Sequence, residues 1–142
     1  MSRIDFYVLP DSGAAARQRF ACRLAEKAYS LKNSVHIRVA DRQAADQLDD
    51  LLWTFRDGSF VPHEQISTAA TDAESPVTIG FGGGDSRDCD LLINLTESVP
   101  ENTATFPRVA EIVTADAPSR QTSRERFASY RDAGHSLDTH KL

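Results

Sequence analysis

The pattern of apolar and polar residues over the first forty positions predicts two strands with a helix between them. Residues 4–9, Ile-Asp-Phe-Tyr-Val-Leu, mix β-branched and aromatic side chains, and the Pro-Asp-Ser-Gly sequence at 10–13 predicts a turn after this strand. Residues 14–32 repeat apolar side chains at helical spacing, with Arg and Lys between them. Residues 35–39 alternate with a period of two, which predicts the second strand.

The rest of the chain predicts further strands and two more helices. Asp41 is a suitable N-cap for a helix that runs to about Thr54, whereas residues 56–76 are rich in Ser, Thr and Ala and predict a loop. Strands are expected at 77–81, 91–95 and 108–114, a last helix at 118–133 and a loose tail at 135–142. This order predicts an α/β fold, an open, mostly parallel sheet of about five strands with helices packed on its faces. Residues 1–134 are expected to form a single domain.

Length and cysteine content indicate a soluble domain of ordinary size. A chain of 142 residues is long enough to form a hydrophobic core without disulfides. Cys22 and Cys89 match no metal or redox spacing, so two buried thiols in a reducing compartment are expected. The N-terminus has no signal peptide and no segment is long enough to span a membrane, so we expect a cytoplasmic protein without membrane contact.

Charge is distributed unevenly along the chain. Residues 1–40 carry seven Lys or Arg against three acids, residues 41–116 four against fifteen, and residues 117–142 five against three. The net charge is −5. An acidic protein is a poor candidate for coating nucleic acid phosphates, although the two basic ends remain candidates for binding acidic partners.

Nothing in the sequence forms a recognisable catalytic, cofactor or metal site. The glycine-rich segment 80–84 lacks the last glycine of a dinucleotide-binding motif and precedes a strand, so we interpret it as a surface turn. The four histidines and two cysteines match no local nucleophile signature, and satisfied or solvated side chains are the simpler interpretation. Asp11 and Asp41 follow predicted strands, where α/β sheets place ligands, but turn and capping roles also explain them.

An aromatic residue lies on the outer face of the second predicted helix. At 100° per residue counted from Ala44, Leu48 and Leu52 fall at about 40° and 80° on a core-facing stripe, whereas Trp53 falls at about 180°. The apolar residues Phe60, Val61 and Pro62 follow in the predicted loop. This loop either covers Trp53, or the aromatic residues form an exposed protein-binding surface.

The last predicted helix carries a row of guanidinium groups. Arg120, Arg124 and Arg131 fall within about 40° of one another, and Phe127 lies beside them. Guanidinium groups recognise carboxylates and phosphates, so this stripe is a candidate site for an acidic peptide or a nucleic acid backbone. An ordinary solvated basic face is the alternative.

These segments together resemble the chi subunit family of bacterial DNA polymerase III. The most specific stretch is 51–63, Leu-Leu-Trp-Thr-Phe-Arg-Asp-Gly-Ser-Phe-Val-Pro-His, which is similar to that family's L-W-…-S-F-V-P-H signature. Segments 5–9, 90–95 and 124–134 are similar in order and spacing, so the resemblance covers nearly the whole chain. It implies a Rossmann-like domain without cofactor or catalytic chemistry.

The resemblance also implies two protein partners. The psi subunit, which connects chi to the clamp loader, would bind at Trp53, Phe60, Val61 and Pro62, and a repair helicase is a further candidate partner there. The acidic C-terminal tail of single-stranded DNA-binding protein would bind at Val113, Arg120, Arg124, Phe127 and Arg131. Ala128 stands where the family has a basic residue, and Arg131 is a candidate substitute.

Two other hypotheses compete with such an adaptor. One is a small α/β enzyme or nucleotide-binding protein that uses the crevice near Asp11 and Asp41. The other is direct DNA binding through the arginine stripe, although no specific DNA binding is expected.

Overall fold

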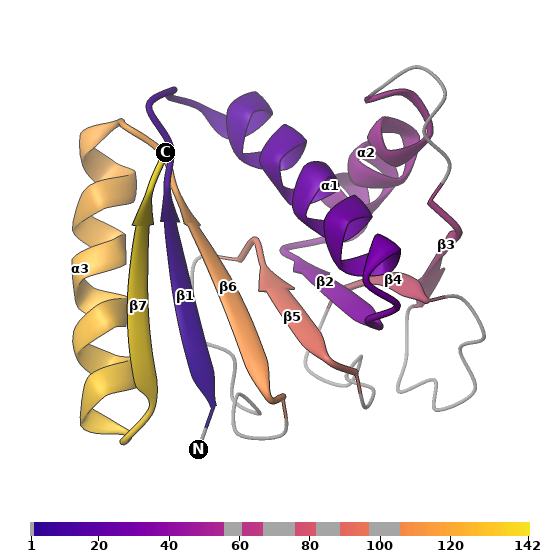
Figure 1. Ribbon diagram of the computed structural model, residues 1–142. Coiled ribbons are helices and arrows are strands. Elements are labelled where there is room, and N and C mark those ends of the chain that lie inside the picture. Colours follow the sequence, from indigo (N-terminus) through magenta and orange to yellow (C-terminus); the bar gives the residue numbers. More distant parts are fainter. Residues whose placement is uncertain (1, 56–60, 67–75, 82–88, 97–105) are drawn as a thin grey trace.

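The computed structural model describes residues 2–55, 61–66, 76–81, 89–96 and 106–142. In chain order the elements are β1 (Arg3–Val8), α1 (Ala14–Ser30), β2 (Val35–Val39), α2 (Arg42–Thr54), β3 (His63–Ile66), β4 (Val77–Phe81), β5 (Leu91–Asn94), β6 (Arg108–Val113), α3 (Ala117–Asp132) and β7 (Ser136–Lys141) (Figure 1). None of the described helices is long and apolar enough to cross a membrane.

The strands form one open parallel sheet in the order β3-β4-β2-β5-β6-β1-β7. All five residues of β2 are buried, as expected where a parallel sheet is covered on both faces. Buried His36 in this strand is satisfied, because its Nδ1 lies 2.8 Å from Oγ1 of Thr78. The α/β prediction is confirmed, with seven strands where about five were expected.

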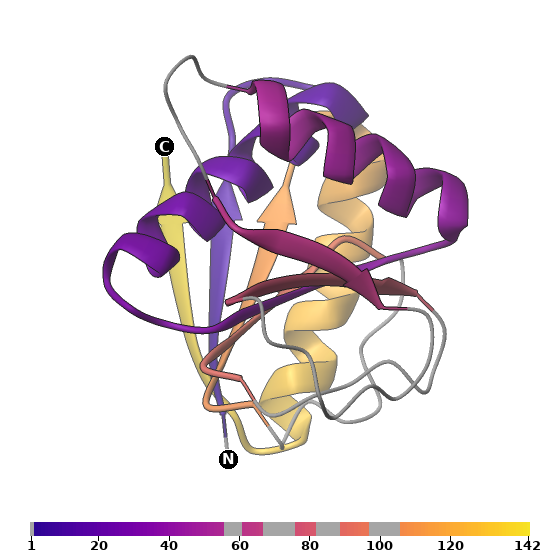
Figure 2. The same cartoon turned by 90° about the vertical axis from the view of Figure 1, so that its right-hand side faces the viewer.

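Helices cover the two faces of the sheet from opposite sides. Leu91 and Ile93 pack into a core with α1 and α2, whereas Leu92 between them packs into a second core with α3. This alternation within one strand places α1 and α2 on one face and α3 on the other. Figure 1 shows this separation, and Figure 2 shows α2 running alongside β3. Residues exposed on α2 therefore lie on the opposite side of the sheet from residues exposed on α3.

Both edge strands differ from the sequence prediction. β3 lies within the segment 56–76 that was expected to be a loop, and β7 replaces the loose tail expected at 135–142, so both expectations are wrong there. Both edge strands are mostly polar, so they lack the apolar pattern that identifies a strand. Leu137 is the one residue of β7 that packs into the hydrophobic core beneath α3. The strand is held mainly by parallel pairing with β1, in a register that begins with Arg3 opposite Ser136 and ends with Val8 opposite Lys141.

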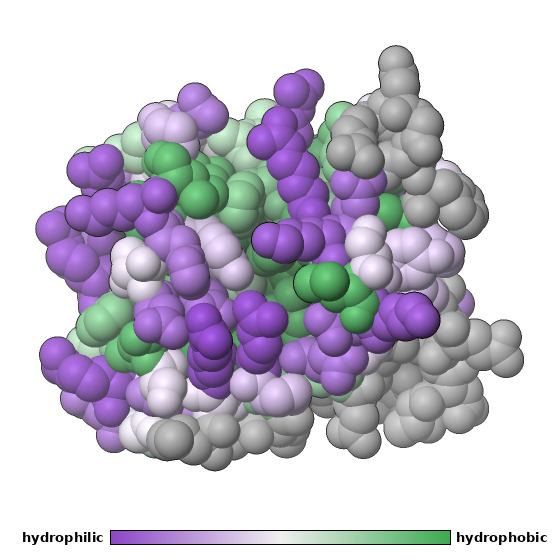
Figure 3. Space-filling model, in the orientation of Figure 1, coloured by the Kyte–Doolittle hydropathy of each residue, from purple (hydrophilic) through white to green (hydrophobic). Residues whose placement is uncertain are grey.

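Polar contacts around buried Asp5 of β1 connect β7 with β1 and β6. Buried Asp5 of β1 accepts hydrogen bonds from Arg3 at 3.2 Å and Arg108 at 3.2 Å, and its carboxylate lies 3.0 Å from Nε2 of His140. Burial raises the pKa of Asp5, but the contacts with His140, Arg108 and Arg3 together lower it below its usual range. Figure 3 shows a surface on this side of the molecule on which hydrophilic residues predominate, with a few hydrophobic ones among them. The polar residues of β7 are thus part of the sheet rather than a tail.

Helix ends follow the predicted signals, and one of them gives a stability test. Asp41 precedes α2, and its side chain accepts a hydrogen bond from the backbone N–H of Ala44 at 2.8 Å. Asp41→Ala is expected to lower the free energy of unfolding by about 1 kcal/mol, because a helix N–H loses its acceptor. Urea denaturation measures this change. Asp41→Asn, which keeps a capping oxygen, should retain most of the stability, and equal midpoints for wild type and Asp41→Ala would contradict the capping role.

Candidate functional sites

Trp53 is exposed on the outer face of α2, as the helical spacing predicted. Its side chain leaves the helix about 140° from that of the buried Leu48, and 51% of the residue remains accessible. The indole packs against the ring of His63, with 4.6 Å between ring centroids. The described part of the following segment therefore supports one side of Trp53 without covering it. Exposed large aromatic side chains of this kind are common anchors in protein interfaces.

His63 is held by hydrogen bonds from both of its ring nitrogens. Nδ1 lies 2.7 Å from the carbonyl oxygen of Val61, and Nε2 lies 2.5 Å from Oδ1 of Asp49. A carbonyl oxygen and a carboxylate both accept, so each of these contacts is a hydrogen bond when the facing ring nitrogen carries a proton. Gln65 adds hydrogen bonds to Asp49 at 2.9 Å and Asp46 at 3.0 Å. These contacts fix edge strand β3 to α2 beneath Trp53.

The sequence analysis missed this role of His63 and misplaced Val61. Val61 is fully buried in the core with α1 and α2, so its side chain cannot form part of an exposed psi surface and that assignment is corrected. Pro62 is half-buried next to it. Phe60 lies outside the described residues. No local pattern in the sequence signals this role of His63, because only the fold brings Asp49 within reach.

The arginine stripe on α3 is exposed, as predicted. Arg120, Arg124 and Arg131 are all exposed, and their described contacts are weak: Arg124 donates to Gln121 at 3.2 Å, and Arg131 lies 3.5 Å from the exposed carboxylate of Asp132. Neither contact buries a guanidinium group. The three side chains therefore remain accessible to an acidic ligand.

An apolar area adjoins the stripe. Phe127 is half-buried with its ring 5.4 Å from that of Phe6, and Val113 is 4% exposed in the same cluster. Phe127 and Val113 thus belong to the same apolar cluster. Val113 offers little surface of its own, whereas half-buried Phe127 offers carbon surface beside exposed guanidinium groups.

A buried network anchors α3 to the sheet. Glu111 of β6 accepts hydrogen bonds from Arg126 at 2.7 Å, Asn94 at 2.9 Å and Tyr130 at 2.5 Å. Burial raises the pKa of Glu111, and burial together with the adjacent carboxylate raises the pKa of Tyr130. Arg126 supplies the balancing charge on the buried side of the helix, which leaves Arg120, Arg124 and Arg131 on the outer side.

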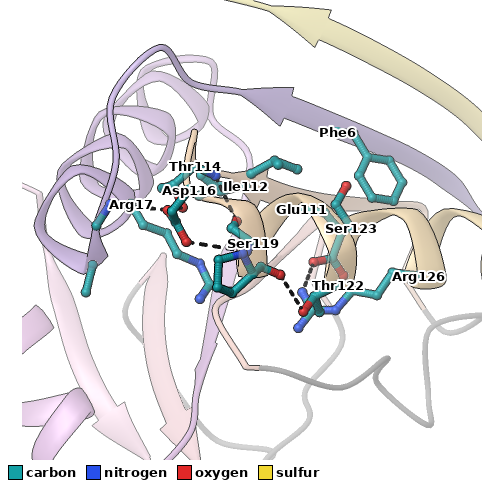
Figure 4. A pocket seen from close by; sticks show the side chains of 14 residues that line it. Phe6, Arg17, Glu111, Ile112, Thr114, Asp116, Ser119, Thr122, Ser123 and Arg126 are labelled. Atoms are coloured by element: carbon teal, nitrogen blue, oxygen red, sulfur yellow. Dashed lines mark hydrogen bonds and ion pairs between the residues drawn. The ribbon is translucent and has the colours of Figure 1, made fainter.

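A crevice lies where ligands bind in many α/β folds. Its volume is about 250 Å³, and it opens at the carboxyl ends of β1 and β6, between the N-terminal ends of α1 and α3 (Figure 4). Several of the lining side chains, including Glu111, Thr114, Asp116 and Ser119, make internal hydrogen bonds. Asp116 accepts hydrogen bonds from Thr114 at 2.5 Å, from the N–H of Ser119 at 3.4 Å and from the N–H of Gly13 at 3.4 Å, and the Thr114 contact chiefly lowers its pKa.

The residues proposed for this crevice in the enzyme hypothesis lie elsewhere. Asp41 caps α2, and Asp11 is exposed, with its backbone carbonyl accepting from the N–H of Ala115 at 2.9 Å. Neither is among the residues that line the crevice. Cys22 and Cys89 are buried free thiols, and burial raises the pKa of Cys22 to about 12. Across the described residues, no three His, Cys, Asp or Glu side chains cluster as metal ligands.

Comparison with known sequences identifies close similarity along the whole chain. The family described as DNA polymerase III chi subunit, HolC, matches residues 1–138. DNA polymerase III subunit chi of Pseudomonas aeruginosa is 44% identical over 142 residues, which cover 100% of this chain and 98% of that protein. The Escherichia coli subunit is 30% identical, with 98% and 97% coverage, and the Haemophilus influenzae subunit is 29% identical, with 97% and 96% coverage.

Solved structures share the fold at low sequence identity. T4 UvsW aligns with a TM-score of 0.68 and 10% identity over 99% of this chain, and S. cerevisiae Dbp5 bound to Gle1 aligns with a TM-score of 0.63 and 13% identity over 96%. The chain spans 41% and 42% of the length of these two structures. At this level of identity, the similarity concerns the fold alone.

Proposed function

The chain belongs to the DNA polymerase III chi subunit family, and we propose that it is a non-catalytic adaptor that links the psi subunit to single-stranded DNA-binding protein during replication. Family membership makes it an accessory subunit of the replicative polymerase. In this proposal psi connects it to the clamp loader, and the acidic C-terminal tail of single-stranded DNA-binding protein occupies the other surface. Both contacts would form in the cytoplasm.

The observation that carries this proposal is the separation of two exposed surfaces. Trp53 is on α2, which packs on one face of the sheet, and the arginine stripe is on α3, which packs on the other. Two macromolecules bound at these surfaces would not compete for space. An adaptor requires such an arrangement, since it must hold both partners at once.

The chemistry of each surface supports a different partner. Trp53 and half-buried Pro62, with Phe60, would form an aromatic anchor for psi. Arg120, Arg124 and Arg131 would attract an acidic tail, and Phe127 beside Val113 would receive its apolar end. The internal hydrogen bonds of Asp116 and Glu111 in the crevice favour this adaptor over the nucleotide-binding alternative.

Ligand-dependent thermal stabilisation tests the proposal. A ligand that binds the native state raises its melting temperature, so a peptide with the sequence of the tail of single-stranded DNA-binding protein and purified psi should each do so. ATP, Mg²⁺ and a single-stranded oligonucleotide are expected to have no effect. Stabilisation by ATP or Mg²⁺ without any response to psi or the tail peptide would instead support the enzyme or nucleotide-binding hypothesis, and a response to the oligonucleotide alone would support direct DNA binding.

A further inference from the structure

Acidic side chains surround Trp53 on the outer face of α2. Asp49 and Asp50 precede Trp53 by four and three residues, which places them next to it on the helix surface, and Asp46 is one turn further along. Asp46 and Asp50 are exposed, and Asp49 has 29% of its side chain accessible. The exposed indole is therefore one part of a mixed aromatic and acidic surface, which we call the Trp53 surface and define by Asp46, Asp49, Asp50 and Trp53.

Internal contacts use only part of this negative charge. Nε2 of His63 contacts Oδ1 of Asp49, and the neutral amide of Gln65 donates to Asp49 and to one oxygen of Asp46. Among the described residues, no Lys or Arg forms an ion pair with Asp46 or Asp50, although Arg42 is on the same face at the start of the helix. The surface therefore keeps net negative charge beside the indole.

The same contacts make this surface rigid. His63 is held at both ring nitrogens, and its ring supports the indole of Trp53 at 4.6 Å. A pre-ordered surface loses little conformational entropy when it binds, so its charges can be matched by fixed charges on a partner. Arg and Lys are the matching side chains, and Arg can also stack on an indole face.

We propose that the Trp53 surface binds a basic segment of psi, in which Lys or Arg residues flank an apolar side chain. The apolar side chain packs on Trp53, and the cations pair with Asp46 and Asp50. This inference rests on the proposed function and adds the chemistry of the partner to it. Exposed pairs of this kind mainly increase association rate and specificity, so their share of the affinity is smaller than that of the indole.

The test is a double charge reversal, Asp46→Lys with Asp50→Lys, measured by calorimetric titration with purified psi. We expect affinity to fall about fivefold at low salt, with a smaller difference at high salt, because exposed charges are screened. The matched control is Glu125→Lys with Asp132→Lys, which makes the same charge change at two exposed acids of α3 and should leave psi binding unchanged. Asp50→Lys alone is a second variant that leaves the Gln65 contacts intact.

The outcomes separate this inference from the proposed function. Wild-type or stronger psi affinity in both Asp variants, together with weak binding by Trp53→Ala, would overturn the basic-segment inference and leave the psi surface in place. An equal loss of affinity in the Glu125/Asp132 control would also overturn it, because the effect would then come from net charge. If wild-type protein does not bind psi, or Trp53→Ala binds it normally, the proposed function itself is wrong at this surface.

Discussion

Replacing Trp53 by alanine is expected to weaken psi binding about thirtyfold while leaving the melting temperature nearly unchanged. Truncation of an aromatic anchor in an interface commonly costs about 2 kcal/mol of binding free energy, which corresponds to about thirtyfold. In the free protein half of the residue is accessible, so its loss removes little buried apolar surface from the fold. Calorimetric titration with psi and thermal denaturation of the free protein measure the two quantities.

A second exposed apolar residue provides the control for Trp53→Ala. Leu31, at the end of α1, is 65% exposed, and it is outside the Trp53 surface. Leu31→Ala should therefore bind psi like wild type. If Trp53→Ala unfolds at a clearly lower temperature, the indole belongs to the folded core and its assignment to the interface is wrong. If it binds psi with unchanged affinity, the interface lies elsewhere.

The strands in the middle of the sheet could be predicted because they are buried on both sides. β5 begins with an apolar run of Leu and Ile, β6 has apolar residues at four of its six positions, and β2 and β4 repeat large apolar residues at every second position. The edge strands could not be predicted in this way. β7 has Leu137 as its one large apolar side chain, and its stability comes from pairing with β1 and from charges supplied by Asp5, over a hundred residues away.

The candidate sites show the same limit of local patterns. Helical geometry predicted that Trp53 and the arginine stripe lie on the outer faces of their helices, since this depends only on the angle around a helix, but it left open whether the following segment covers Trp53. Val61 lies in a connecting segment, where the residues next to it in the sequence do not determine whether its side chain points into the core or toward solvent. The contact between His63 and Asp49 forms only because α2 packs beside β3, so it could not be predicted from either segment alone.

Reversing the charge of Arg124 is expected to weaken binding of the acidic tail at least tenfold and to leave psi binding unchanged. Arg124 is central in the stripe, exposed, and bound only to the neutral amide oxygen of Gln121 among its described contacts. We assign it to the terminal carboxylate of the tail, where a guanidinium forms charge-assisted hydrogen bonds. In Arg124→Glu, repulsion replaces this attraction. Calorimetric titration with a tail peptide measures the affinity.

Salt dependence and a matched variant make this test specific. Wild-type affinity for the tail peptide should fall as ionic strength rises, because exposed charges are screened, and the Arg124→Glu variant should show a weaker dependence. Arg19→Glu makes the same change at an exposed arginine of α1, on the other face of the sheet, and should bind the peptide like wild type. Equal affinities for Arg124→Glu and Arg19→Glu would remove Arg124 from the tail site. Tighter binding of single-stranded DNA than of the peptide would favour a role of the stripe in DNA binding instead.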